Sequence, residues 1–182
     1  MAAENNFKNM VLCLFLVCLF CGAILGSVYA VTKKPIEEAL VAEARAAIAE
    51  VLPAGGEISE PIKSGEMEYY VSRIAETISA YAVKSSAAGF SGPLILMVGV
   101  LPDGTIYNTK VLSHSETPGL GAKCDSDAHF IAQWKEFPAN GNITLKKDGG
   151  DIDAITASTI TSRAYSLAVQ NARNLVKSLQ HK

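Results

Sequence analysis

A long uncharged apolar run near the N-terminus constrains this chain more than any other feature. Residues 11–31 read VLCLFLVCLFCGAILGSVYAV and contain no Asp, Glu, Lys or Arg. A helix needs about twenty consecutive apolar residues to cross the hydrocarbon layer of a bilayer. The run therefore predicts a transmembrane helix over residues 10–31, preceded by a short cytoplasmic segment, residues 1–9.

The alternative is a signal peptide that is removed after export, because the SVYA sequence ending at Ala30 has small-residue spacing that a signal peptidase accepts. The apolar run is longer than the usual core of a signal peptide, and a helical pattern continues after it. We therefore expect an uncleaved, single-pass anchor. Lys8 precedes the run and Lys33 and Lys34 follow it, so charge does not decide the orientation. A large trailing domain is exported whatever its charge, and the globular part is expected outside the cytoplasm.

The composition allows one globular domain after the anchor and argues against nucleic acid as a partner. The chain has 182 residues, of which 49% are hydrophobic, and a formal net charge of -2 at pH 7. This length supports one hydrophobic core. The charge balance and the lack of a basic stripe argue against nucleic-acid binding. Because only Cys124 lies outside the apolar run, no disulfide is expected within the soluble domain.

The part after the anchor combines helical and strand-like patterns. Residues 32–53 have apolar positions at helical spacing and form the expected linking helix, and residues 54–182 form the expected globular domain. Helices are expected at residues 125–137 and 162–180, and strands at residues 68–74, 78–85, 94–101, 105–113, 143–147 and 152–155. The nearly all-apolar run LILMVGVL predicts the most buried strand. The predicted fold class is α+β, with a mainly antiparallel sheet flanked by helices.

A Gly-rich loop follows the last of the long predicted strands. Residues 113–123 read SHSETPGLGAK. Gly119 and Gly121 have no side chains, so the backbone there can approach a flat ligand and present its N–H groups to it. Pro-Gly pairs also mark ordinary turns. The loop alone therefore leaves a binding role and a structural role open.

Residues 153–163, DAITASTITSR, crowd small and hydroxyl-bearing side chains ahead of the last predicted helix. One capping Ser or Thr would be enough for a helix start. Thr159 lies just ahead of the positive end of that helix, where backbone N–H groups and the helix dipole favour a phosphate. Its small neighbours Ala157 and Ser158 leave its hydroxyl accessible. The stretch predicts an anion site that holds a phosphate either free or as an ester.

Four further residues raise the question of a metal ion or a nucleophilic cysteine: His114, Glu116, Cys124 and His129. Their spacing matches no zinc pattern, and a Cys-His pair cannot be inferred from separate positions in a sequence. We therefore expect neither a metal site nor a catalytic residue.

Taken together, SHSETPGLGAK and DAITASTITSRA behind a single N-terminal anchor resemble the G subunits of Rnf complexes, the ion-translocating ferredoxin:NAD oxidoreductases. The chain is similar as well to the C subunit of the sodium-pumping NADH:quinone reductase, which shares the FMN-binding domain. The resemblance covers the whole chain, and its shorter length favours the Rnf subunit. It implies FMN as the cofactor, esterified through its phosphate to a threonine by a flavin transferase that uses FAD.

The resemblance also implies site residues. The family motif reads Asp-x-x-Ser/Thr-Gly-Ala-Thr, and its Asp, hydroxyl and acceptor positions fall on Asp153, Thr156 and Thr159. The chain departs from this motif at Ala157, where Gly is usual, and at Ser158, where Ala is usual. The implied cofactor-binding set is Thr159 with Asp153, Thr156, Ser158, Thr161 and Ser162 in the motif, and Glu116, Thr117, Gly119 and Leu120 around the flavin ring.

The function that the resemblance implies is that of an electron-carrying subunit in a larger complex, and not that of a complete enzyme. The implied partners are the other membrane subunits of the complex, notably the D subunit and also the A, B, C and E subunits, with the flavin transferase during maturation and membrane lipid. The implied location is the bacterial inner membrane, with the flavin domain on the periplasmic side. Two alternatives stay open: the quinone-reductase C subunit, and an extracytoplasmic domain that binds a soluble ligand without redox work.

Overall fold

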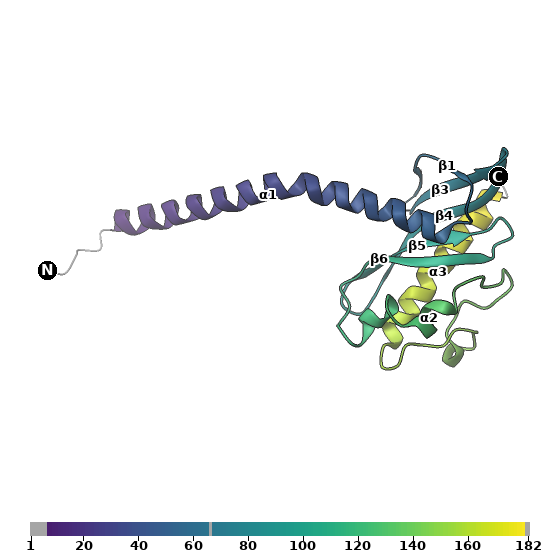
Figure 1. The fold of residues 1–182 in the computed structure, drawn as a ribbon. Coiled ribbons are helices and arrows are strands. Elements are labelled where there is room, and N and C mark those ends of the chain that lie inside the picture. Colours follow the sequence, from purple (N-terminus) through teal and green to yellow (C-terminus); the bar gives the residue numbers. More distant parts are fainter. Residues whose placement is uncertain (1–6, 66, 181–182) are drawn as a thin grey trace. The chain divides into compact units, whose positions relative to one another are not determined.

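The computed structural model describes residues 7–65 and 67–180 (Figure 1). The chain divides into two compact units between Ala42 and Glu43. Residues 1–6 of the predicted cytoplasmic segment lie outside the described residues. Helix α1 (Phe7–Val51) runs through both units without a break, across the border that we expected between the membrane helix and the linking helix.

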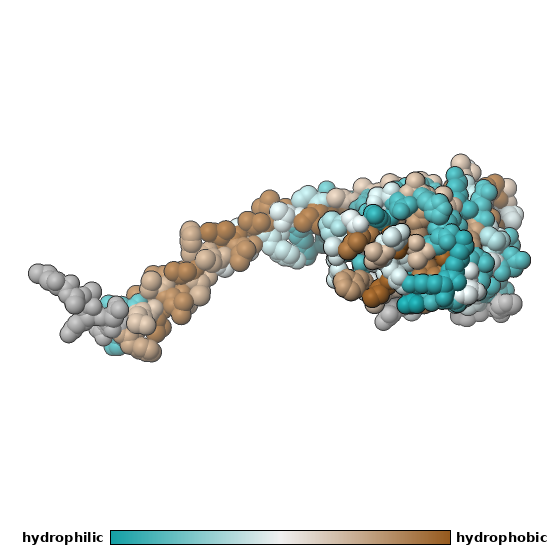
Figure 2. All heavy atoms as spheres, turned by 90° about the horizontal axis from the view of Figure 1, so that it is seen from below, coloured by the Kyte–Doolittle hydropathy of each residue, from teal (hydrophilic) through white to brown (hydrophobic). Residues whose placement is uncertain are grey.

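Within the described residues, the first unit consists of residues 7–42 of α1, most of which are apolar. Its large apolar side chains are exposed, and Figure 2 shows them as a brown surface along the first part of the helix. Among the described residues, α1 is the one helix that is long and apolar enough to cross a membrane. Pro35 lies inside α1, where the missing N–H of proline removes one helical hydrogen bond without ending the helix.

The second unit is built on one six-stranded sheet, in the order β1-β3-β4-β5-β6 with β2 also paired to β3. Its strands are β1 (Glu57–Ile58), β2 (Ile62–Ser64), β3 (Met67–Ile74), β4 (Thr77–Ala88), β5 (Pro93–Val100) and β6 (Ile106–Ser113). Every strand pairing is antiparallel. The predicted α+β fold class and its mainly antiparallel sheet are confirmed.

Helices cover both faces of this sheet. Helix α3 (Thr159–Gln180) packs on the face to which β5 contributes Leu96 and Val98 (Figure 1). The last turns of α1 pack on the opposite face, where Val51 meets Met97 of β5. Successive side chains of a strand point to opposite faces, so a strand covered on both sides is apolar throughout. This explains why nearly all of β5 is buried.

The segment between β6 and α3 is less regular than the sequence predicted. The helix expected at residues 125–137 is limited to α2 (Ala128–Ala132), capped by Asp127, after the 3-10 helix η1 (Gly121–Cys124). The strands expected at residues 143–147 and 152–155 are wrong. The two runs share one parallel bridge between Leu145 and Ile152. Both side chains are buried, but the 3-10 helix η2 (Lys146–Asp148) and left-handed Gly149 turn the chain after that single bridge.

Helix α3 begins at Thr159, earlier than the predicted start at residue 162. The Ser158 carbonyl accepts the Ser162 N–H at 3.0 Å, and this is the first hydrogen bond of the helix. Ser158 is therefore the N-cap residue. The hydroxyl-bearing residues that follow it form the first helical turn, so Thr159 is part of the helix instead of lying ahead of it.

Candidate functional site

The two stretches singled out in the sequence meet in one cavity of about 360 Å³. The loop after β6 supplies one side of the cavity, the start of α3 supplies another, and the turn between β4 and β5 adds Phe90. The lining residues are Phe90, Glu116, Thr117, Leu120, Gly121, Ala157, Ser158, Thr159, Ile160 and Thr161. The structure thus brings together most of the residues that the sequence indicated as cofactor-binding.

Thr159 is half-buried at the positive end of α3. The first amides of a helix have no acceptor within the helix. The helix dipole adds the equivalent of about half a positive charge at this end. Such a terminus binds phosphate through its N–H groups, and here the Thr159 hydroxyl lies beside them in the cavity lining.

A tight turn leads the chain into α3. The Ser158 N–H donates to the Ile155 carbonyl at 3.0 Å, and Ala157, the third residue of this turn, has a φ of 61°. A positive φ at this position favours glycine, because the left-handed conformation costs a residue with a side chain roughly 1–2 kcal/mol. The turn gives a physical reason for the glycine that the family motif carries where this chain has Ala157.

Glu116 ties three chain segments together at the cavity. Its side chain is buried. Oε1 accepts the backbone N–H groups of Phe90 and Ser91 at 2.8 and 3.2 Å, and Oε2 accepts the Thr161 hydroxyl at 2.7 Å. Both carboxylate oxygens are therefore bound to donors of the protein itself, and Glu116 organises the cavity as well as lining it.

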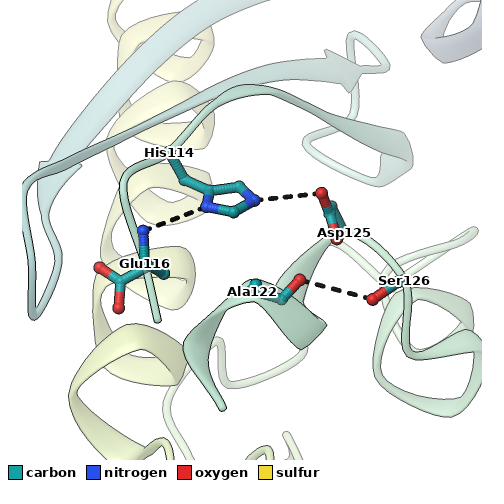
Figure 3. Close-up of polar contacts among 5 residues, drawn as sticks. All are labelled: His114, Glu116, Ala122, Asp125 and Ser126. Carbon is teal, nitrogen blue, oxygen red and sulfur yellow. Dashed lines mark hydrogen bonds and ion pairs between the residues drawn. The ribbon is translucent and has the colours of Figure 1, made fainter. Parts of the chain in front are cut away.

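A second group of polar contacts holds the backbone of Glu116, as Figure 3 shows. His114 Nδ1 accepts the Glu116 N–H at 3.2 Å, and His114 Nε2 lies 3.1 Å from Asp125 Oδ2. Because Nδ1 is the acceptor, the proton of the neutral ring belongs on Nε2, which donates to the carboxylate. The Ser126 hydroxyl donates to the Ala122 carbonyl at 3.4 Å. These contacts fix the two ends of the Gly-rich loop relative to each other.

Two glycines are required by the close packing around the Glu116 carboxylate. A Cβ atom on Gly121 would lie 2.4 Å from Oε2 and 2.8 Å from Thr161 Oγ1, and a Cβ atom on Gly89 would lie 2.2 Å from Oε1. Gly119 instead has a φ of 76° in the left-handed region, which favours glycine. The Gly-rich loop therefore has a structural requirement for its glycines at this site.

Three consecutive residues of η2 contact the segment that ends in the first turn of α3. The contacts are Lys146 Nζ to Asp153 Oδ2 at 2.7 Å, Lys147 Nζ to Thr159 Oγ1, and Asp148 to Arg163 Nε and Nη2 at 2.8 Å each. Hydrogen bonds from the Arg163 guanidinium hold the pKa of the Asp148 carboxyl below its ordinary value. Lys147 was not among the residues predicted from the sequence, because no spacing rule relates a lysine in η2 to a hydroxyl at the start of α3.

Four of the predicted site residues lie outside the cavity lining. Asp153 is in the ion pair with η2, and Thr156 and Gly119 are exposed on turns. Ser162 is buried, and its hydroxyl donates to the Ser158 carbonyl at 2.9 Å and accepts the Ile155 N–H at 3.0 Å. Asp153 and Ser162 thus stabilise the shape of the loop that presents Thr159.

Most of the large apolar side chains of the cavity were not among the residues predicted from the sequence. Phe90, Leu120 and Ile160 are 69%, 45% and 50% exposed, and only Leu120 was among the predicted residues. Phe90, in the turn between β4 and β5, and Ile160, in the first turn of α3, are single large apolar residues among small and polar neighbours. This isolation is the signal that could have identified them. By contrast, Trp134 and Tyr165 are fully buried and stack on each other at 5.1 Å between ring centroids, so they belong to the core.

The residues considered for a metal or a nucleophile have other surroundings. Within residues 7–65 and 67–180, no group of three or more His, Cys, Asp or Glu side chains is arranged to hold a metal ion. Cys124 is buried, and this burial raises the pKa of its thiol to about 12. A thiol with that pKa stays protonated at neutral pH and is a poor nucleophile.

Comparison with known proteins gives the family. The family model of the FMN-binding domain matches residues 89–174. The G subunit of the proton-translocating ferredoxin:NAD(+) oxidoreductase complex of Clostridium ljungdahlii is 31% identical over 93% of this chain and 91% of its own length. The G subunit of the ion-translocating oxidoreductase complex of Pasteurella multocida is 31% identical over 91% of this chain and 92% of its own length.

Among solved structures, the crystal structure of Shewanella oneidensis NqrC is similar to 71% of this chain and 73% of that chain, with 22% identity and a TM-score of 0.47. The sequence relatives match more than nine-tenths of the chain. The chain therefore belongs to the family of G subunits of ion-translocating oxidoreductase complexes of the Rnf type, and its FMN-binding domain covers residues 89–174.

Proposed function

We propose that this chain is a membrane-anchored subunit of an ion-translocating ferredoxin:NAD oxidoreductase complex and that it relays electrons through FMN attached covalently to Thr159. The surroundings of the Thr159 hydroxyl are the observation that supports the proposal. The Thr159 hydroxyl lines the cavity, stands at the start of α3 and accepts a hydrogen bond from an ammonium group. Of the complexes that the resemblance left open, this one agrees with the names of the full-length sequence relatives.

The cavity offers both kinds of surface that FMN requires. The Thr159 hydroxyl, the first-turn amides of α3 and the Lys147 ammonium suit a phosphate. Phe90, Leu120 and Ile160 offer apolar contact for a planar ring. The cavity volume of about 360 Å³ falls in the range of roughly 300–1,000 Å³ that is usual for small-molecule sites. Thr117 and Gly119, on the Gly-rich loop, remain the other proposed ring neighbours.

The proposed ester forms by substitution at phosphorus. The bond between Thr159 Oγ and the flavin-bearing phosphorus of FAD forms, the bond from that phosphorus to the bridging oxygen of the diphosphate breaks, AMP leaves, and the hydroxyl proton is released to water. No electron is transferred in this step, which a flavin transferase performs. FMN then supplies the redox chemistry, while the protein positions it and prevents its loss.

The placement of the chain in the membrane is part of the same proposal. Residues 10–31 form the membrane span, residues 32–53 the linking helix, and residues 54–182 the flavin domain on the periplasmic side of the bacterial inner membrane. The apolar stretch of α1, long enough to cross a bilayer, supports the anchor. The partners are the other membrane subunits of the complex, with the D subunit foremost, and membrane lipid.

The intact mass of the chain purified from its own membranes tests the proposal. We expect the mass of the unmodified polypeptide plus one esterified FMN, and a fluorescent band at this position after denaturing electrophoresis. Thr159→Val should abolish both signals, because it removes the side-chain oxygen through which the phosphorus would be bonded to the protein. Thr159→Ser should keep them, because it retains the hydroxyl.

Peptide mass spectrometry supplies the control. Thr156→Val and Ser158→Ala should leave the flavin on the peptide that contains Thr159. A flavin found on Thr156, Ser158 or Thr161 would contradict the assignment of the acceptor. A colourless, unmodified chain from cells that contain the transferase would instead favour the ligand-binding alternative without redox work.

A further inference from the structure

Backbone hydrogen bonds and core packing hold the 3-10 helix η2 beside the start of α3. The Lys146 N–H donates to the Ile152 carbonyl at 2.8 Å, and the Asp148 N–H donates to the Leu145 carbonyl at 2.8 Å. Leu145 and Ile152 are both buried in the core. The packing of these two residues thus holds η2 in place. The side chains of its three residues all contact residues 153–163, the segment that carries Thr159.

Two of the three charged side chains of η2 form ion pairs, and the third, Lys147, does not. Lys146 pairs with Asp153, and Asp148 pairs with Arg163 through two parallel hydrogen bonds. Lys147 has no carboxylate within 4.0 Å of Nζ in the part of the chain that the structure describes, and its contact is with Thr159 Oγ1. An unpaired ammonium therefore stands at the oxygen that would carry the phosphoryl group.

We propose that Lys147 binds the phosphoryl group at Thr159 and that η2 is the element that positions it. This inference rests on the proposed function, because it concerns the same ester. A diphosphate that approaches Thr159 and the phosphodiester that remains there are both anions. The ammonium offsets that charge during the transfer and afterwards, by moving its hydrogen bond from Thr159 Oγ to a phosphoryl oxygen.

The Asp148–Arg163 pair has a defined part in this arrangement. Asp148 is next to Lys147 in the chain, and its carboxylate would compete with a phosphate for the ammonium. The two hydrogen bonds from Arg163 hold that carboxylate away from this competition. Arg163→Gln should therefore lower the rate of flavin attachment, because the freed Asp148 carboxylate competes for Lys147. Adding Asp148→Asn should restore the rate.

The experiment uses the full-length chain in detergent with a purified flavin transferase and FAD, and it follows the initial rate of flavin attachment by in-gel fluorescence. The variants are Lys147→Gln, Lys147→Glu and Lys147→Arg, with Lys135→Gln as the matched control. Lys135 is an exposed lysine away from the cavity lining. The melting temperature of each unmodified chain is measured in parallel, so that a folding defect is recognised.

We expect Lys147→Gln to lower the attachment rate about tenfold, the size that follows from losing a hydrogen bond to a charged group at a half-exposed site. Lys147→Glu should lower it further, and Lys147→Arg should stay within about threefold of the native chain because it keeps the charge. The difference between the native chain and Lys147→Gln should shrink as salt is added. The melting temperatures should stay unchanged.

Two results would overturn the inference. One is native attachment rates in Lys147→Gln. The other is an equal loss in Lys147→Arg and Lys147→Gln, which would indicate that shape and not charge matters. A native chain that takes no flavin at Thr159 would overturn the proposed function and this inference together, whereas a flavinylated native chain with an unaffected Lys147→Gln variant overturns this inference alone.

Discussion

Removal of the Glu116 side chain is the perturbation whose effect the structure defines best. Glu116→Ala deletes a buried carboxylate that accepts hydrogen bonds from the Phe90 and Ser91 amides and from the Thr161 hydroxyl. Each hydrogen bond to a charged acceptor stabilises a fold by about 1.5–3 kcal/mol. The two amides belong to a turn that water can reach, but the Thr161 hydroxyl is buried and would lose its partner. We therefore expect a loss of about 3–5 kcal/mol in the free energy of unfolding.

The conservative variant divides this loss. Glu116→Gln keeps the shape and one acceptor oxygen, and its amide NH₂ can donate to Thr161 Oγ in place of the lost acceptor. We expect it to cost about 1–2 kcal/mol, because the charge is lost while the contacts remain. Glu57→Ala serves as the control, since Glu57 is exposed on β1, and it should change the free energy by less than about 0.5 kcal/mol.

The assay is urea unfolding of the full-length chain in detergent, followed by fluorescence. Trp134 is the only tryptophan of the chain and is fully buried, so its emission reports the unfolding of the globular unit. A destabilisation below about 1 kcal/mol for Glu116→Ala would refute the reasoning, since it would mean that the three donors find water or other partners without cost.

Three further substitutions test other parts of the fold, each by the same unfolding measurement. Ala157→Gly should stabilise the chain by up to about 1 kcal/mol, because relief of the left-handed strain exceeds the added freedom of the unfolded chain; a loss of stability would contradict the turn geometry. Replacing Ala75 and Glu76 together by Asn and Gly should stabilise the β3–β4 hairpin by about 1 kcal/mol, since both residues have positive φ and this pair is preferred in such turns. Ile48→Ala should destabilise the globular unit by about 2–5 kcal/mol, whereas the same change at exposed Ile36 should have little effect; equal effects would argue against α1 as part of the core.

The strands and helices of the regular part of this fold could be predicted from the sequence, because each has the residue pattern of one type of secondary structure. The four long strands lie close to their predicted bounds, since each is a run of strand-forming residues followed by a turn or loop. The burial of β5 follows from its lack of polar residues. The end of α1 is different. Ala47, Ile48 and Val51 fit a helix of any kind, and only the structure shows that they cover one face of the sheet.

The segment between β6 and α3 could not be predicted in detail, because tertiary contacts determine its conformation. Leu145 and Ile152 have the pattern of strand residues, yet they are buried through one bridge beside a 3-10 turn. At the candidate site, the hydroxyl-rich stretch and the Gly-rich loop were identifiable from their unusual composition. Phe90 and Lys147 were not, since each reaches the cavity from a turn whose position depends on the folded sheet and on the packing under η2.

The contacts of the Glu116 carboxylate determine when the cavity forms during folding. Its two oxygens join a turn near residue 90 to a helix start near residue 161, and the loop that holds it comes from between them. None of these three parts has the others as sequence neighbours, so the pocket is absent until the sheet has aligned them. If the proposed attachment takes place in the completed pocket, it follows folding of the domain. A chain that carries flavin would then be one in which these three segments already have their native arrangement.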